Sequence, residues 1–289
     1  GVADDLARRI TALAKDGNLG AIDNLSRTSA YAATRDAVFE YWVNALLSGP
    51  KTHMVNAISN TSTVFLAQAE RMAAAGVGGM RGTVDGVDAT EAGAMLHGAL
   101  ASLPDAWRNL KKSFATGETG FGVQKLETPR TRSISSEALG NTRSEMLNNA
   151  MNVPLIAHGI NAMGAVITVP GRALGASDEF FKTISYRMEV HAQAARQAHD
   201  ELRAGAITQG DVKRRLAELA DEPSDQVALS TREFAAYNTF TNEPGKFTKV
   251  INAARNKFPT TRCLKLQPET TTNIVRFMAE RSPAGLAMP

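Results

Sequence analysis

Five histidines are the first residues to consider for chemistry, because imidazole serves as a metal ligand and as a general acid or base. They are His53, His97, His158, His191 and His199. No pair has the i, i+4 spacing of a helical zinc site, and no HExxH motif occurs. His191 and His199 would lie roughly 12 Å apart along one helix, too far to share an ion. The sequence therefore predicts no metal site.

Other patterns that carry chemistry are also missing. The glycine-rich stretches GVGGMRG and GETGFG lack the Lys-Ser/Thr pair of a Walker loop and the preceding strand of a dinucleotide turn. No GxSxG elbow occurs, and the single cysteine, Cys263, has no histidine nearby in sequence. We therefore predict no catalytic residue and no cofactor. An enzyme whose site is assembled from distant acids and histidines stays open as an alternative.

The charge pattern gives a weak indication of nucleic-acid contact. The net charge is +3 and the pI is near 9.0, but acidic and basic residues alternate along the chain. A dedicated nucleic-acid binder concentrates its basic residues on one face. Arg130 and Arg132 lie in a polar, broken stretch and are the best candidates for loose contact with a DNA backbone.

The elements that must position these residues are predicted to be helices. Only 6% of residues are aromatic and alanine is abundant, which favours closely packed helices over a strand-rich sandwich. We predict an all-α fold, an elongated or loosely packed multi-helix bundle with helical hairpins and a long irregular connector. The predicted helices cover residues 4–15, 29–48, 52–75, 90–103, 104–117, 143–169 with a break near Pro154, 177–202, 208–220, 225–237, 246–256 and 271–282.

The helices over 29–48 and 52–75 are predicted to form a tight hairpin. Gly49 suits a left-handed cap, Pro50 cannot continue the first helix, and Thr52 can begin the second, which Gly76 would end. The apolar residues of each helix are expected to face the core. These are Phe39, Val43, Leu46 and Leu47 in the first, and Val55, Ile58, Phe65, Leu66, Ala69 and Met72 in the second.

Two later segments shape the predicted domain organisation. Residues 118–142 are polar and aperiodic, so we expect a connector between a helical region over 1–117 and another over 143–289. Pro170 and Gly171 would then end one helix. Ser177 would cap the next, with Asp178 and Glu179 in its first turn, where the helix dipole favours acidic residues.

Residues 151–169 are apolar for nearly the length that spans a bilayer. They also contain Asn152, His158, Asn161 and several glycines, which make insertion unfavourable. We therefore predict a buried helix or an interhelical packing face. A transient membrane contact is the alternative.

Three stretches resemble a known family. They are EYWVNALLSGPKTHMVNAISN (40–60), PGRALGASDEFFKTISYRMEVHAQAARQA (170–198) and NIVRFMAERSP (273–283). In this order and at these separations they resemble the large internal virion proteins, or ejection proteins, of tailed bacteriophages, best known in short-tailed phages. They also resemble a segment found within very large phage polyproteins.

The resemblance implies a structural role and no catalysis. Such proteins are packaged in the capsid near the portal, leave with or before the genome, and help to build a conduit across the host envelope. It implies self-association and contact with other ejection proteins and the portal. The motif positions assigned to fold and assembly are Trp42, Asn44, Gly49, Pro50, Asn56, Asn60, Asp178, Phe181 and Lys182.

The residues agree in kind with such a role. Alanine-rich helices with glycine breaks bury little area each, and the absence of disulfides lets them separate and repack. Since the chain begins at Gly1 and ends in an apolar tail, we expect a piece of a longer protein. Two further alternatives are an intracellular, phage-delivered module that acts on a host factor, and a fixed capsid or tail component.

Overall fold

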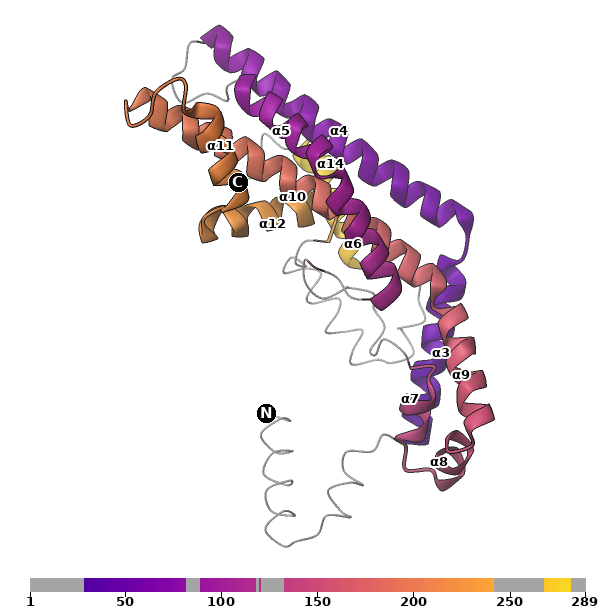
Figure 1. The fold of residues 1–289 in the computed structure, drawn as a ribbon. Helices are drawn as coiled ribbons and strands as arrows, with labels where there is room; N and C mark the ends of the chain where they lie inside the picture. The colour runs from indigo at the N-terminus through magenta and orange to yellow at the C-terminus, as the bar shows by residue number, and fades with distance from the viewer. Residues whose placement is uncertain (1–28, 82–88, 118–119, 121–132, 242–267, 282–289) are drawn as a thin grey trace, which may run out of the picture. The chain divides into compact units, whose positions relative to one another are not determined.

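The computed structural model describes residues 29–81, 89–117, 120, 133–241 and 268–281 (Figure 1). Across these residues the chain forms eleven α-helices and no strand, so the predicted all-α class is confirmed. The predicted helices over 4–15 and 246–256 lie outside the described residues. So do Arg130, Arg132 and Cys263.

The chain divides into two compact units, and each joins two segments that are distant in sequence. Residues 1–49 and 126–171 form unit 1, and residues 50–125 and 172–289 form unit 2. The sequence-based boundaries at 117 and 143 do not coincide with this division. A five-residue helix also lies within the stretch that was predicted to be an irregular connector.

The described residues of unit 1 contain four whole helices, with serine caps at three of their N-termini. The side chains of Ser29, Ser135 and Ser144 each accept a hydrogen bond from a backbone N–H of the first turn, which satisfies donors that the helix itself leaves unpaired. The longest helix packs against two of the others. The four are α3 (Ala30–Leu47), α7 (Ser136–Gly140), α8 (Glu145–Met151) and α9 (Pro154–Ile167).

The buried side of α3 is more polar than its sequence suggested. Of the predicted apolar stripe only Leu47 is buried, and Glu40 and Asn44 share that side. The carboxylate of Glu40 accepts from the backbone N–H of Ile134 at 2.8 Å, and the side-chain oxygen of Asn44 accepts from the N–H of Gly171 at 3.0 Å. These buried N–H groups need acceptors, and the α3 side chains supply them.

Glycine at position 164 lets α9 approach the chain that enters α7. A Cβ there would lie 2.0 Å from the carbonyl oxygen of Ile134. Gly164 is also the only residue of α9 that is buried. The apolar side chains around it are largely exposed, with Leu155 at 83% and Val166 at 71%. The prediction of a buried helix is therefore wrong, whereas the contact at Gly164 agrees with the other form of that prediction, an interhelical packing face.

No single helix in the described ranges has both the length and the apolar character to cross a membrane. The pair formed by α8 and α9 meets the length and composition criteria only jointly, and the two helices are bent by 89° at the break between them. The predicted interruption near Pro154 is confirmed, since α9 begins at that proline.

Unit 2 is built around two long helices that run in the same direction, α4 and α10 (Figure 1). Side chains early in α4 meet Asp178 of α10, and Arg71 later in α4 meets Glu189. Five shorter helices make up the rest of the described part of the unit. The seven are α4 (Pro50–Arg81), α5 (Ala89–Ala101), α6 (Leu103–Thr116), α10 (Val169–Arg203), α11 (Val212–Asp221), α12 (Asp225–Asn238) and α14 (Pro268–Glu280), with the first three residues of α10 counted in unit 1.

Small side chains let the helices of unit 2 pack closely. The main core cluster consists of Ala67, Met95, Ala106, Ile184, Met188 and Ala192. A Cβ on Gly98 of α5 would lie 2.6 Å from the carbonyl oxygen of Arg187 and 2.9 Å from the His191 ring. Glycine at position 98 is therefore what lets α5 lie directly against α10.

The predicted starts at Thr52 and Ser177 and the predicted end at Gly76 are wrong, and each error concerns a proline or a glycine. Pro50 begins α4, because a proline is well suited to the first turn, where its missing N–H is not needed. Gly49 is not in the left-handed conformation, and α4 continues through Gly76 to Arg81. Likewise Pro170 lies in the first turn of α10, which makes Ser177 an interior residue.

Several predicted boundaries are confirmed. Gly117 ends α6 in the left-handed conformation with φ of +72°. The predicted start at Thr208 is wrong, because Thr208 and Asp211 contact each other in the turn before α11, which begins at Val212. The predicted helices at 90–103, 225–237 and 271–282 match α5, α12 and α14 to within about three residues at each end.

Candidate functional site

Three of the motif residues meet in unit 2. The side-chain amide of Asn56 donates to the carboxylate of Asp178 at 2.9 Å, and the amide of Asn60 donates to the same oxygen at 3.3 Å. Asn60 also donates to Asn56 at 3.3 Å. We call these three residues the Asp178 cluster. It joins two of the stretches that carry the family resemblance, which lie more than a hundred residues apart.

The electrostatics of Asp178 follow from its surroundings. Desolvation by the surrounding protein raises its pKa, because charge is disfavoured away from water. The hydrogen bond from Asn56, the charge of Lys182 and the hydrogen bond from Asn60 lower the pKa but do not cancel that effect. The structure places Asp178 inside α10, so its predicted position in the first turn of a helix is wrong.

Glu179 is also interior, and it faces a different segment. One carboxylate oxygen accepts from the backbone N–H of Gly120 at 2.8 Å. The other is buried and has no hydrogen-bond partner among the described residues. Burial raises the pKa of Glu179, while Gly120 and Lys182 act in the opposite direction. Two adjacent acids are thus both held in surroundings that disfavour their charge.

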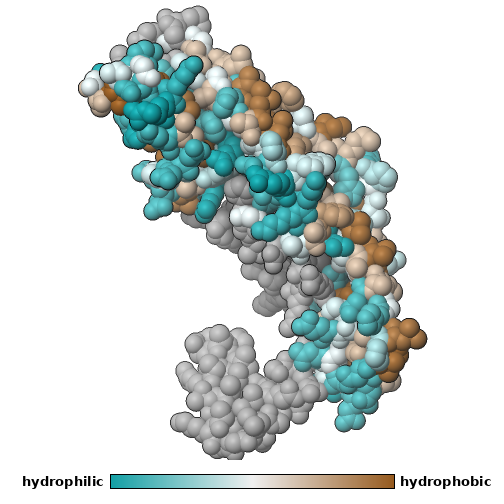
Figure 2. Space-filling view, viewed as in Figure 1, coloured by the Kyte–Doolittle hydropathy of each residue, from teal (hydrophilic) through white to brown (hydrophobic). Residues whose placement is uncertain are grey.

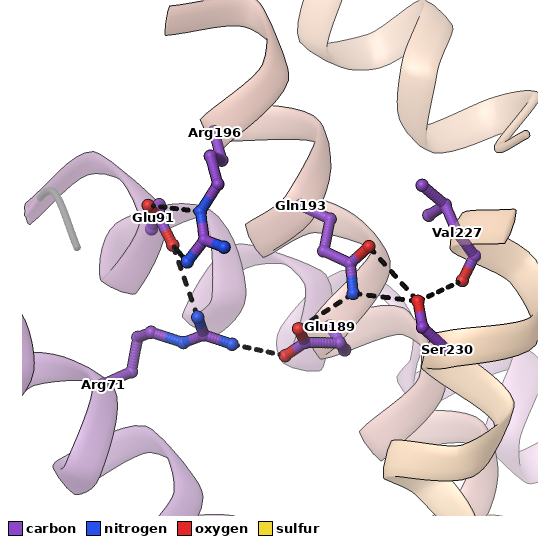
Figure 3. Close-up of polar contacts among 7 residues, drawn as sticks. All are labelled: Arg71, Glu91, Glu189, Gln193, Arg196, Val227 and Ser230. Atoms are coloured by element: carbon purple, nitrogen blue, oxygen red, sulfur yellow. Dashed lines mark hydrogen bonds and ion pairs between the residues drawn. The ribbon is translucent and has the colours of Figure 1, made fainter. Parts of the chain in front are cut away.

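A second set of polar residues spans α4, α5 and α10 (Figure 3). Arg71 contacts Glu91 at 3.3 Å and Glu189 at 2.5 Å. The guanidinium of Arg196 donates twice to Glu91, at 3.1 Å and 2.9 Å. Both glutamates are buried. We call these four residues the arginine–glutamate network.

The network reaches a fourth helix through neutral side chains. Gln193 donates to Glu189 at 3.1 Å and to the hydroxyl of Ser230 on α12 at 3.2 Å. Ser230 donates in turn to the carbonyl oxygen of Val227 at 3.0 Å (Figure 3). Four helices are therefore connected by one continuous set of polar contacts.

The charges of the network balance, with two arginines and two glutamates. The hydrogen bond to Glu91 raises the pKa of Arg196. The two carboxylates are buried, whereas the side chain of Arg196 is half exposed. Removing an arginine would leave a buried carboxylate with less compensation, which is destabilising. Since both acids are engaged by arginine, this arrangement can hold helices in a fixed register.

A histidine pair lies beside the close contact of Gly98 on α5 with α10. The rings of His97 and His191 have centroids 5.5 Å apart, and Nδ1 of His191 lies 2.9 Å from the carbonyl oxygen of Arg187. Burial, together with the charges of His97 and Arg187, lowers the pKa of His191. In the part of the chain that the structure describes, no three His, Cys, Asp or Glu residues are grouped so that they could hold a metal ion.

The other motif residues are distributed over both units. In unit 1, the ring centroids of Trp42 and Phe39 lie 6.0 Å apart, and the side-chain oxygen of Asn44 accepts from the backbone N–H of Gly171. In unit 2, Phe181 packs edge-on against Phe180 at 5.3 Å. Gly49 and Pro50 stand at the junction of the units. The assembly role assigned to these residues stays a prediction.

Sequence reasoning missed the arginine–glutamate network. Its members are distant in sequence, so no local pattern joins them. One signal was present within α10, where Glu189, Gln193 and Arg196 recur at helical spacing among alanines. A polar stripe on an alanine-rich helix indicates a face that binds polar groups of another helix.

Comparisons with known proteins add no relative. No family model matches the sequence, and neither a curated protein nor a solved structure matches it significantly. The fold defines the chain as an all-α protein, and the polar contacts above define its candidate site.

Proposed function

We propose that the chain is a non-enzymatic structural protein of a tailed-phage virion. It is packaged in the capsid near the portal and leaves with the genome to help form a conduit for DNA across the host envelope. The observation that carries the proposal is the Asp178 cluster. Residues from two of the stretches that resemble ejection proteins bind one another there, as expected if those stretches specify one structural unit.

The surface supports a role in assembly. Large apolar side chains are exposed on most of the described helices, among them Tyr31, Phe65, Trp107 and Met146. Extensive apolar exposure marks surfaces that are covered by partners. In the proposed function those partners are further copies of the chain, other ejection proteins and the portal.

Two further contacts belong to the proposal. The apolar side chains of residues 151–169, most of them on α9, provide a transient membrane contact while the envelope is being crossed. The exposure of Leu155, Met163 and Val166 supports such a contact. Arg130 and Arg132 provide non-specific contact with the DNA backbone.

The test is quantitative mass spectrometry of purified virions before and after triggered genome release. A fixed copy number that falls in emptied particles, measured against a major head protein as internal standard, is the expected result. Retention in emptied particles would identify a fixed capsid or tail component instead. Absence from virions, with detection only in infected cells, would favour a module acting on a host factor.

A further inference from the structure

The side of α4 that faces the rest of unit 2 is polar and its exposed side is apolar, which is the reverse of what its sequence predicts. Its polar residues Asn60, Thr63 and Arg71 turn toward the rest of unit 2, where they bind Asp178, the carbonyl oxygen of Asn238, and the two glutamates. The apolar residues that were predicted to be buried lie on the opposite side and are exposed. Figure 2 shows hydrophobic residues along the length of this helix.

The exposed side has the spacing of a helix-pairing seam. Its residues recur at alternating steps of three and four, which is the heptad pattern that keeps one stripe of a helix facing a partner helix. All seven positions are exposed. We call this set the α4 seam, and it consists of Val55, Ile58, Ser62, Phe65, Ala69, Met72 and Gly76.

From Ile58 onward, large and small residues alternate along the seam. One heptad position holds Val55 and then Ser62, Ala69 and Gly76, and the other holds Ile58, Phe65 and Met72. In a parallel pair each position faces its own copy, so Ile58, Phe65 and Met72 would each meet an equally large residue. In an antiparallel pair the two positions face each other, and Ile58, Phe65 and Met72 each have a small residue opposite.

Charge sets no preference between the two directions. From residue 52 to 80 the only charged side chains are Glu70, which pairs with Arg281, and Arg71, which points inward. Lys51 and Arg81 lie at the two ends of α4, so like charges come near each other in either arrangement. The alternation of large and small residues is therefore what favours the antiparallel pair.

The area is sufficient for a specific contact. The exposed apolar residues of this side show between 39% and 70% of their surface. Together with Met54, Leu66 and Val77 they present on the order of 700 Å². A standard protein interface buries about 800 Å² per partner. A lipid surface is a poorer match, because an interfacial helix carries lysines and arginines beside its apolar stripe and α4 has almost none there.

We propose that the α4 seam binds the α4 seam of a second copy of this chain, in an antiparallel pair. Phe65 of one copy packs against Ala69 of the other, and Ile58 packs against Gly76. The inference rests on the self-association within the proposed function and assigns it a surface and a direction. It is tested on the purified chain without virions, so its failure is distinguishable from failure of the virion experiment.

The first experiment is sedimentation equilibrium of the full chain over a range of concentrations. We expect reversible dimers for the wild type and a dissociation constant at least about tenfold weaker for both Phe65→Glu and Ala69→Lys. An equimolar mixture of these two variants should dimerise again, because each glutamate then faces a lysine. Leu229→Glu, at an exposed apolar position on α12, is the matched control and should leave the dimer unchanged.

The second experiment fixes the direction, using single cysteines in a Cys263→Ser background. A mixture of Ile58→Cys and Gly76→Cys should form a disulfide-linked dimer under mild oxidation. Ile58→Cys alone should not, because its two copies would be roughly 27 Å apart in the antiparallel pair. Efficient self-linking of Ile58→Cys would overturn the antiparallel arrangement.

Two other results would overturn the proposal as a whole. One is a wild-type chain that stays monomeric at all concentrations while Phe65→Glu lowers its stability, which would mean that part of the same chain covers the seam. The other is a monomer that binds anionic lipid vesicles and loses this binding with Phe65→Glu.

Discussion

The Asp178 cluster and the arginine–glutamate network connect the same two long helices by opposite electrostatic means. In the network, buried carboxylates are held by guanidinium groups, which stay charged at every ordinary pH. In the cluster, a carboxylate is held by neutral amides, and desolvation raises its pKa. The contact between α4 and α10 therefore has one part in which guanidinium groups compensate the buried carboxylates and another in which neutral amides bind a carboxylate whose pKa is raised.

The largest expected effect comes from breaking the network at its centre. Glu91→Gln keeps the shape of the side chain but leaves Arg71 and Arg196 without their shared negative partner. We expect the free energy of unfolding to fall by about 2–4 kcal/mol, as measured by urea denaturation, because three hydrogen bonds to a buried carboxylate are lost while Arg71 keeps Glu189 and Arg196 is half exposed. The control is Glu218→Gln, which removes exposed pairs with Arg214 and Arg215 and should cost less than about 1 kcal/mol. Similar losses for both variants would show that the network is no stronger than a surface pair.

Asn60→Ala tests how much the Asp178 cluster contributes to the free energy of unfolding. It removes a buried donor to a carboxylate, and we expect a loss of about 1.5–3 kcal/mol at neutral pH. Because Asn60 stabilises the ionised form of Asp178, the loss should shrink as the pH falls and the carboxylate becomes protonated. Urea denaturation of the wild type and the variant at pH 7 and at pH 4 measures the loss of stability at each pH. A loss that is equal at the two values would separate Asn60 from the charge of Asp178.

Gly98→Ala should weaken the network and leave the cluster intact. The added Cβ would meet the Arg187 carbonyl and push α5, which carries Glu91, away from α10, so we expect a loss of about 1–3 kcal/mol. Gly93→Ala is the matched control on the same helix, because nothing lies within 4 Å of its added Cβ. It should stabilise by up to about 1 kcal/mol. Thermal unfolding of the two variants gives the comparison, and equal shifts would contradict the close approach.

Asp178→Asn should have the smallest effect and the clearest pH signature. A carboxyl group whose pKa is raised by folding contributes fully below its ordinary value of 3.8, and this contribution is lost as the pH rises through the folded value. The asparagine variant lacks this loss. We therefore expect it to lie within about 1 kcal/mol of the wild type at pH 4 and to gain relative stability as the pH rises. A gap that widens as the pH falls would reverse the sign and contradict the raised pKa.

Sequence reasoning predicted the helices better than the faces that they bury. Local signals identified Ser29 and Gly117, because a cap is a contact between near neighbours. The inward side of α4 could not be predicted in this way. Its buried residues Asn60 and Arg71 are satisfied by groups on α5 and α10, and no single-sequence pattern shows those partners.

The same limit applied to the candidate site. The resemblance selected Asn56, Asn60 and Asp178 as residues of fold and assembly, and the structure brings these three together. Periodicity placed Asp178 at a helix start instead, because a serine followed by two acids is also the ordinary signature of an N-cap. Pro170 at the start of the helix was the competing signal, since proline suits a first turn.

The parallel course of α4 and α10 has a mechanical consequence. If the chain is drawn lengthwise through a narrow opening, α4 slides along α10, and the Asn56–Asp178 and Arg71–Glu189 contacts bear the load together. If the helices are peeled apart from one end, the contacts break one after another at lower force. The resistance of unit 2 to extraction therefore depends on the direction of pulling, which single-molecule force spectroscopy from alternative attachment points would measure.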